Sequence, residues 1–305
     1  MMLIVFFISL IVLFLWGMYL IRKGLTALTS EKIEKSLLLF TDHPLKAFLI
    51  SILFTGVLQS SSAFMVIAIG LVSAGALTFK QAIPMVLGTN VGSTFTTQFL
   101  AVRLEYLILP LILFGVLLVI TGNQKFKSLG TSFLGLGLIF LCIDSFSALA
   151  GPISNNELGA LMIQISNESI WHSFFFGAIF TAIIHSSSVC ISVIMGLMNG
   201  GVFQLINAFA VVLGSNVGTC ITAVMASARG GQAARQTSLT HVLFNVAGVL
   251  LAFPFLPQFV QSIYFLSSNP AQQIAHFSLL FNLFTALIVL PFTGYIHRVV
   301  AFIVK

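Results

Sequence analysis

The sequence predicts an all-α membrane protein that crosses the bilayer several times and is built from two related halves. Three observations predict this fold: the composition, an internal repeat and the distribution of basic residues. Of the 305 residues, 58% are hydrophobic and only 7% are charged, and the mean hydropathy is +1.11. A soluble domain averages about 25% charged residues, so this composition offers no water-soluble surface. Because roughly 20 apolar residues span a bilayer, the apolar runs leave room for about seven to nine such elements.

The chain contains two pairs of matching motifs that are separated by the same distance. The motif QSSS begins at Gln59, and HSSS begins 126 residues later at His185. The motif GTNVGST begins at Gly88, and GSNVGTC begins at Gly214, again 126 residues later. Chance does not produce two pairs with one offset, so we infer an internal duplication.

The duplication divides the chain into repeats. Aligned without gaps at this offset, residues 54–97 and 180–223 are identical at 16 of 44 positions. We therefore predict a first repeat at 1–125, a second repeat at 126–252 and a C-terminal transmembrane segment at 253–305.

Each repeat contains an apolar run that is too long for one span and carries its polar residues at the centre. The two runs are residues 44–75 and 170–201. We predict that each is a re-entrant hairpin of two half-depth helices, because polar, non-helical backbone at that depth must be buried in protein or line a cavity. The next spans, 81–100 and 204–226, contain the motif G-[TS]-N-V-G, which predicts a broken transmembrane helix in each repeat.

The distribution of basic residues favours this topology. If the hairpins re-enter, each repeat crosses the bilayer three times, and the second repeat is inverted relative to the first. Of the 13 basic residues, 12 then lie on one side and only Arg103 on the other. The 12 residues are Arg22, Lys23, Lys32, Lys35, Lys46, Lys80, Lys125, Lys127, Arg229, Arg235, Arg298 and Lys305. The positive-inside rule makes the crowded side cytoplasmic, which predicts an outer N-terminus and a cytoplasmic C-terminus in a multi-pass protein of the cell membrane. The same rule explains the formal net charge of +6 without binding to nucleic acid.

The polar tips predict a transporter site. At each tip the second helix begins with unpaired N–H groups and the positive end of its dipole, which favour an anion. Broken helices would free backbone carbonyls, and Asn90 and Asn216 would add amide oxygens, which are ligands for a small cation. Inverted repeats with a polar cluster at the midplane are typical of secondary transporters. The local chemistry of the tips therefore suits an anion together with a small cation.

Other classes of protein fit less well. The serines could serve only in helix packing, but both motifs recur in both halves. An intramembrane serine protease needs one nucleophile with a positioned base, and the sequence has no G-x-S-x-G elbow. Two opposed tips also favour alternating access over a channel. We expect no enzymatic activity and no cofactor other than the coupling ions. Cys142, Cys190 and Cys220 lie in apolar surroundings and are expected to be inert thiols.

The segments LQSSSAF and GTNVGST, repeated as HSSS and GSNVGTC, resemble the sodium-dependent phosphate cotransporter family, which includes the type II renal and intestinal carriers and bacterial homologues. The resemblance covers both halves. It implies sodium-driven uptake of inorganic phosphate by alternating access of the elevator type, and often a homodimer. No arginine lies at the predicted depth, which favours phosphate over a dicarboxylate, although sulfate and dicarboxylates stay open as substrates and protons as the coupling ion.

The resemblance also implies which residues bind phosphate and sodium. By position they are Gln59, Ser60, Ser61, Ser62, Thr89, Asn90, Ser186, Ser187, Ser188, Ser215 and Asn216. We add His185 to the predicted binding residues, because its imidazole can still donate a hydrogen bond. The sodium ligands among them would be Ser62, Thr89, Asn90, Ser188, Ser215 and Asn216.

Two features depart from the family pattern. His185 stands where the second motif usually has Gln, and because histidine titrates near neutral pH, pH-dependent transport through His185 is a hypothesis. Many bacterial relatives carry a soluble regulatory domain after the repeats, whereas this sequence ends at Lys305, so we expect its regulation to differ.

The inverted topology predicts that residues 80 and 199 lie on opposite faces of the membrane. Single variants Lys80→Cys and Asn199→Cys should therefore react with an impermeant thiol reagent from opposite sides of oriented vesicles. Labelling of both positions from the same side would contradict the re-entrant topology.

Overall fold

The computed structural model of the chain describes residues 2–39, 41–102, 105–120 and 123–305, and the side chains of residues 29–39 are not described. Within these ranges the chain is helical and contains no β-strand. Arg103, the one basic residue predicted outside, lies outside the described residues, as do the side chains of Lys32 and Lys35.

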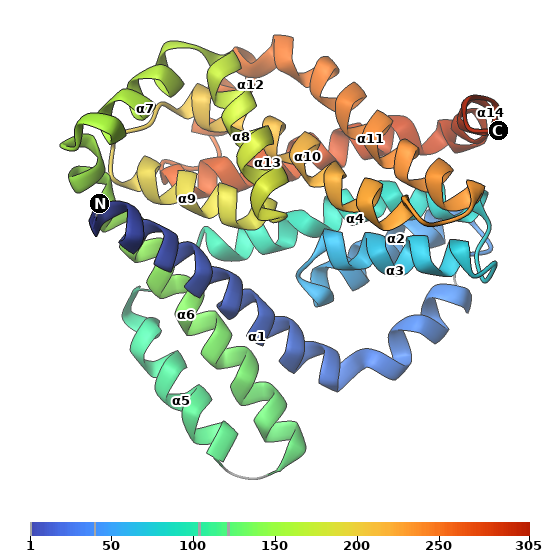
Figure 1. Cartoon of the computed structure of the whole chain (residues 1–305), viewed down its shortest axis with the longest axis horizontal. Coiled ribbons are helices and arrows are strands. Elements are labelled where there is room, and N and C mark those ends of the chain that lie inside the picture. The colour runs from blue at the N-terminus through green and yellow to red at the C-terminus, as the bar shows by residue number, and fades with distance from the viewer. Residues whose placement is uncertain (1, 40, 103–104, 121–122) are drawn as a thin grey trace.

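The helices follow one another with short connections (Figure 1). They are α1 (Met2–Leu39), α2 (Pro44–Leu58), α3 (Ser61–Ser73), α4 (Phe79–Leu100), η1 (Glu105–Leu107), α5 (Ile108–Ile120), α6 (Gln124–Ser154), α7 (Glu157–Glu168), α8 (Ile170–Ile184), α9 (Ser187–Asn199), α10 (Leu205–Ser227), α11 (Gln232–Ala252), η2 (Phe253–Phe255), α12 (Leu256–Tyr264), α13 (Pro270–Val289), η3 (Leu290–Phe292) and α14 (Thr293–Ile303).

The helix lengths and outer surfaces are those of a multi-pass membrane protein. Among the described residues, five segments are long and apolar enough to cross a bilayer. A sixth candidate is α4 together with Glu105–Ile120, which comprises η1 and α5, and the two parts meet at an angle of 85°. The five are Met2–Leu28, Gln124–Ser154, Leu205–Ser227, Gln232–Tyr264 and Pro270–Ile303. On α8, Trp171, Phe175, Ile179 and Ile183 are exposed at a spacing of four residues, so they form an apolar stripe on one face of the helix. An apolar stripe of this kind fits lipid better than water.

The two polar-tipped runs each form a pair of short helices. In the first run α2 has 15 residues and α3 has 13, and in the second run α8 has 15 and α9 has 13. At 1.5 Å per residue these helices are about 20–22 Å long, which is shorter than the roughly 30 Å hydrocarbon core of a bilayer. None of them can cross alone. Their depth in the membrane and the inversion of one pair relative to the other stay predictions.

The chain reverses in the same way in both pairs. Gln59 and His185 adopt left-handed backbone conformations, with φ of 51° and 57°, and each ends the first helix of its pair. The next residue caps the second helix: the Ser60 hydroxyl accepts from Ala63 N–H at 3.1 Å, and Ser186 accepts from Val189 N–H at 3.4 Å. The 126-residue repeat therefore extends from sequence to local backbone structure.

The broken helices predicted at 81–100 and 204–226 are wrong. Both α4 and α10 continue as unbroken helices through the G-[TS]-N-V-G motif. The glycines are instead four residues apart on one face, a spacing that lets two helices approach closely. A Cβ on Gly88 would lie 2.3 Å from the Phe48 carbonyl oxygen of α2, and a Cβ on Gly214 would lie 1.9 Å from the Phe174 carbonyl oxygen of α8. The motif therefore attaches each hairpin to the following span, and it does not free carbonyls for a cation.

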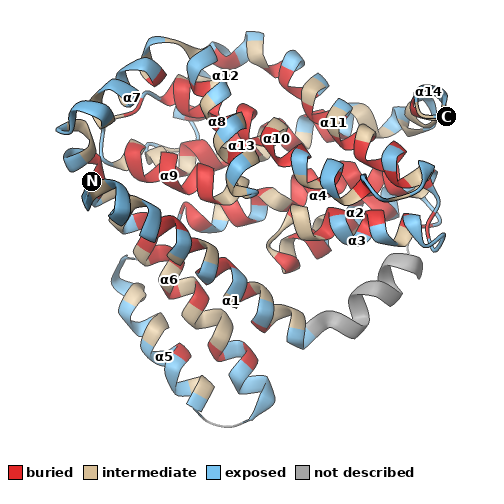
Figure 2. Cartoon of the chain, viewed as in Figure 1, coloured by how far each residue is buried: buried red, intermediate tan, exposed pale blue. Residues whose placement is uncertain are grey.

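The helices gather into groups around a buried centre. α1 and α5 both pack on α6, while α2 packs on α4 and α8 on α10. Figure 1 shows α1, α5 and α6 together on one side of the molecule, and Figure 2 shows most buried residues on the central helices α4, α9, α10 and α13. The Phe209 and Phe277 rings stack at 4.1 Å between centroids and join α10 to α13 in this core.

The close glycine contacts generate a stability prediction. Gly88→Ala should lower the free energy of unfolding by about 2–3 kcal/mol, because its Cβ meets backbone atoms of α2 that cannot move independently. Gly70→Ala on α3 is a matched control, since nothing lies within 4 Å of its added Cβ, and it should be neutral or stabilising by up to about 1 kcal/mol. Thermal unfolding in detergent measures both. Equal unfolding temperatures for the two variants would contradict the contact between α2 and α4.

Candidate functional site

Both hairpin tips line one cavity of about 600 Å³. Residues 59–63 come from the first tip, and residues 185–188 come from the second. The structure therefore brings together eight of the residues predicted to bind substrate or ions. The remaining walls come from α1, α3, α4 and α10, and their main residues are Leu15, Met18, Tyr19, Arg22, Val66, Ile67, Ser93, Thr96 and Thr222.

The start of α3 and the start of α9 both border this cavity. The first N–H groups of any helix have no partner in a preceding turn, and they carry the positive end of the helix dipole. Here they are accompanied by the hydroxyls of Ser61 and Ser62 on α3 and of Ser187 and Ser188 on α9. Two helix starts that share one cavity with hydroxyl donors favour an anion with several oxygen atoms.

Gln59 and His185 have equivalent structural roles beside the cavity. The Gln59 side-chain amide donates back to the Gly56 carbonyl, and the His185 backbone N–H donates to the Thr181 carbonyl at 2.8 Å. Each residue thus closes the end of a short helix in a left-handed conformation. The two residues thus share a backbone conformation, although Gln59 bonds through its side chain and His185 through its backbone.

Thr96 and Thr222 line the cavity and were not predicted as site residues. They are separated by 126 residues and are one of the identical pairs in the repeat alignment. The alignment could therefore have identified them as candidate site residues. The Thr222 hydroxyl lies 3.4 Å from the Ser62 hydroxyl. This contact joins the first tip directly to α10 of the second half.

Four predicted sodium ligands do not reach the cavity: Thr89, Asn90, Ser215 and Asn216. The Thr89 hydroxyl accepts from Thr55 at 2.9 Å, and the Ser215 hydroxyl donates to a carbonyl of its own helix at 2.8 Å. The Asn216 amide likewise donates back to its own helix at 3.1 Å. Because the helices are unbroken here, these side chains lie within helix contacts, away from the tips. Their role in binding sodium stays a prediction.

Asn90 belongs to a buried polar network between α4 and α11. Its amide nitrogen donates to Asn245 Oδ1 at 2.8 Å, and its Oδ1 lies 3.1 Å from His241 Nε2. Asn245 in turn donates to the His241 carbonyl at 2.9 Å. Buried polar groups need partners of this kind, so in this structure the Asn90 amide serves to hold α4 against α11.

The expectation that no arginine reaches the site is wrong, because Arg22 lines the cavity. α1 is one helix from Met2 to Leu39, so Arg22 lies within it. Leu15, Met18 and Arg22 are spaced three and four residues apart, so they share one face of α1. No acidic side chain of the described residues lines the cavity. The charge of this site is therefore positive.

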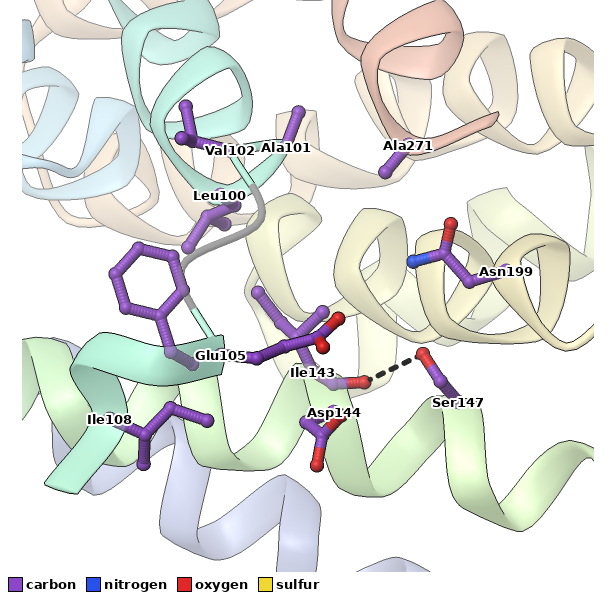
Figure 3. A pocket seen from close by; sticks show the side chains of 11 residues that line it. Leu100, Ala101, Val102, Glu105, Ile108, Ile143, Asp144, Ser147, Asn199 and Ala271 are labelled. Atoms are coloured by element: carbon purple, nitrogen blue, oxygen red, sulfur yellow. Dashed lines mark hydrogen bonds between the residues drawn. The ribbon is translucent and has the colours of Figure 1, made fainter. Parts of the chain in front are cut away.

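A second, smaller cavity of about 170 Å³ lies where the end of α4, η1 with the start of α5, and α6 meet (Figure 3). Its lining includes the carboxyl groups of Glu105 and Asp144. The Ser147 hydroxyl at its edge donates to the Ile143 carbonyl at 3.1 Å, and Asn199 faces it from α9. Its acidic lining is unsuited to an anion, so the cavity between the tips is the candidate substrate site.

The chain matches known proteins along most of its length. The sequence model of a family described as "Na+/Pi-cotransporter" matches residues 13–148 and 152–290. "Uncharacterized protein YqeW" of Bacillus subtilis (strain 168) is 57% identical over 300 residues, which cover 98% of each chain.

Two more distant relatives have descriptive names. "Putative inorganic phosphate export protein YjbB" of Escherichia coli (strain K12) is 26% identical over 293 residues, or 95% of this chain and 54% of the relative, so the chain spans about half of its length. "Sodium-dependent phosphate transport protein 2B" of Homo sapiens is 32% identical over 142 residues, 42% of this chain and 21% of the relative. No solved structure matches the chain.

Proposed function

Since the chain belongs to the Na+/Pi-cotransporter family, we propose that it binds inorganic phosphate between its two hairpin tips and carries it across the cell membrane. One observation supports this assignment most directly: both serine-bearing tips and Arg22 line a single cavity without an acidic residue among the described side chains. Hydroxyl and N–H donors from two directions suit the oxygens of a tetrahedral anion.

The coupling ion that we propose is sodium, and the direction is uptake. A negative membrane potential opposes the entry of an anion by about 2.3 kcal/mol per charge per 100 mV, and entering sodium ions would offset this cost. The name of the human relative supports sodium dependence. The name of the relative from Escherichia coli favours a second candidate, export of phosphate, and protons are the alternative coupling ion.

For the transport step we propose alternating access with elevator-type motion of the hairpins. α2 packs on α4 and α8 on α10, whereas α1 and α5 pack on α6. In the proposed motion the α1–α5–α6 group stays fixed while the hairpins move, and α9, which also packs on α6, slides against it. Ser62 and Ser188 are the predicted sodium ligands that already border the cavity. Inversion of the two hairpins, an outer N-terminus and a homodimer belong to the same proposal.

Phosphate uptake into proteoliposomes tests the proposed function. We expect labelled phosphate to accumulate with an inward sodium gradient, and Ser61→Ala and Ser187→Ala should each reduce uptake by about tenfold or more, because each removes a hydrogen bond to a charged ligand. Ser154→Ala is a matched control, since this α6 serine only donates to the Gly151 carbonyl of its own helix.

The same assay separates the alternatives. Loss of uptake in only one of the two tip variants would contradict a site shared by both tips. Competition by sulfate or succinate stronger than that by phosphate would identify a different anion. Efflux from phosphate-loaded vesicles without uptake would favour export, and uptake that follows a proton gradient alone would exclude sodium coupling.

A further inference from the structure

We infer that Arg22 is the anion-binding cation of the cavity, and that its guanidinium pairs with the oxyanion held between the two tips. The inference rests on the proposed function and adds to it a residue from α1, outside both serine motifs. It assigns the ligand class as an oxyanion with at least two oxygens that a guanidinium can contact.

Of the two neighbouring basic residues on α1, Arg22 and Lys23, only Arg22 lines the cavity. Arg22 lies on the face of α1 that borders the cavity, together with Leu15, Met18 and Tyr19. Lys23 is exposed, does not line the cavity, and has its ammonium 6.0 Å from the centroid of the Tyr19 ring. The helical spacing thus directs one positive charge to the cavity and the next one away from it.

The hydrogen-bonding state of Arg22 indicates a missing anionic partner. Its Nε is buried and has no hydrogen-bond partner among the described residues. The Arg22 side chain as a whole is half-buried, and a buried donor without a partner is destabilising. Here no acidic side chain of the described residues lines the cavity, and Asp42, the acidic residue of the α1–α2 connection, pairs with Lys46 at 2.9 Å. A diffusible anion between the tips would complete the hydrogen bonding.

Arg22 and the tips would recognise different properties of the anion. A guanidinium presents donors in a planar fork that matches two oxygens of a phosphate or carboxylate, and it cannot accept a hydrogen bond. The serine and threonine hydroxyls around it can either donate or accept, so they, unlike Arg22, can accept a hydrogen bond from a proton carried by phosphate. Arg22 would therefore supply charge and affinity, while the hydroxyls would distinguish protonated phosphate from unprotonated sulfate.

Because Arg22 lies on α1, its contact with the anion would also affect the stability of the folded chain. α1 packs mainly on α6, whereas the first helices of the hairpins, α2 and α8, pack mainly on α4 and α10. An anion that touches both Arg22 and the tips would add a contact between these groups to the existing packing of α2 on α1 and of α9 on α6. Anion binding should then stabilise the whole chain against unfolding, beyond a local effect on one hairpin.

The test compares Arg22→Gln and Arg22→Lys with Lys23→Gln, the neighbouring control. Phosphate-dependent thermal stabilisation in detergent measures binding, and the same preparations are assayed with sulfate. We expect Lys23→Gln to match the native protein, Arg22→Gln to need about 10- to 100-fold more phosphate for the same stabilisation, and Arg22→Lys to fall between them. Without phosphate, Arg22→Gln should unfold no earlier than the native protein, because it removes an unpaired charge.

Two results would overturn the inference. One is a folded Arg22→Gln protein that needs less than twice the native phosphate concentration. The other is a variant that unfolds earlier without phosphate but keeps its full phosphate-induced shift, which would identify a structural role. If Arg22→Gln does not fold, the phosphate concentration that Arg22→Lys needs for the same thermal stabilisation is compared with that of the native protein.

The comparison of phosphate with sulfate separates this inference from the proposed function. If the native protein responds to sulfate and not to phosphate, the proposed function fails, and loss of the sulfate response in Arg22→Gln would still support the role of Arg22. A native response to phosphate that persists in Arg22→Gln would leave the function standing and overturn the inference. A native protein that responds to neither anion would overturn both.

Discussion

A helix that begins inside a membrane protein must find partners for its first backbone N–H groups, and this requirement organises the whole structure. At the two hairpin tips, Ser60 and Ser186 satisfy one N–H group each by capping. The remaining donors of α3 and α9 border the cavity between the tips. The starts of these two helices are therefore concentrated at one place, and that place is the anion site that we propose.

The tips can meet there only because each hairpin is fixed to a long helix. The glycine pairs of α4 and α10 bring the backbones of α2 and α8 into contact, and the contacted carbonyls, Phe48 and Phe174, are again 126 residues apart. The same short set of contacts thus builds both halves of the site. Thr222, which lies beside Ser62, then joins the halves to each other.

Much of this arrangement could be predicted from the sequence, because a repeated polar motif in an apolar chain has few physical explanations. The helical fold, the polar positions 59–62 and 185–188 and the 126-residue repeat were all read from residue patterns. The course of α4 was misread, since glycines four residues apart suit both a kink and a close helix contact, and only the partner helix decides between them. Arg22 was missed because it follows an apolar run, and a basic residue in that position is expected at the membrane surface.

The central claim is that the two tips face each other across one anion site, and cross-linking of the tips tests it most directly. Ser62→Cys with Ser188→Cys should be joined rapidly by a short bifunctional thiol reagent, and phosphate should slow the reaction. The native cysteines Cys142, Cys190 and Cys220 are buried and provide a low background, while Ser62→Cys with Ser154→Cys is the control pair. Rapid, phosphate-protected cross-linking of the tip pair alone is the predicted result. Tip cysteines that each react singly but never join, or that join no faster than the control pair, would contradict the account.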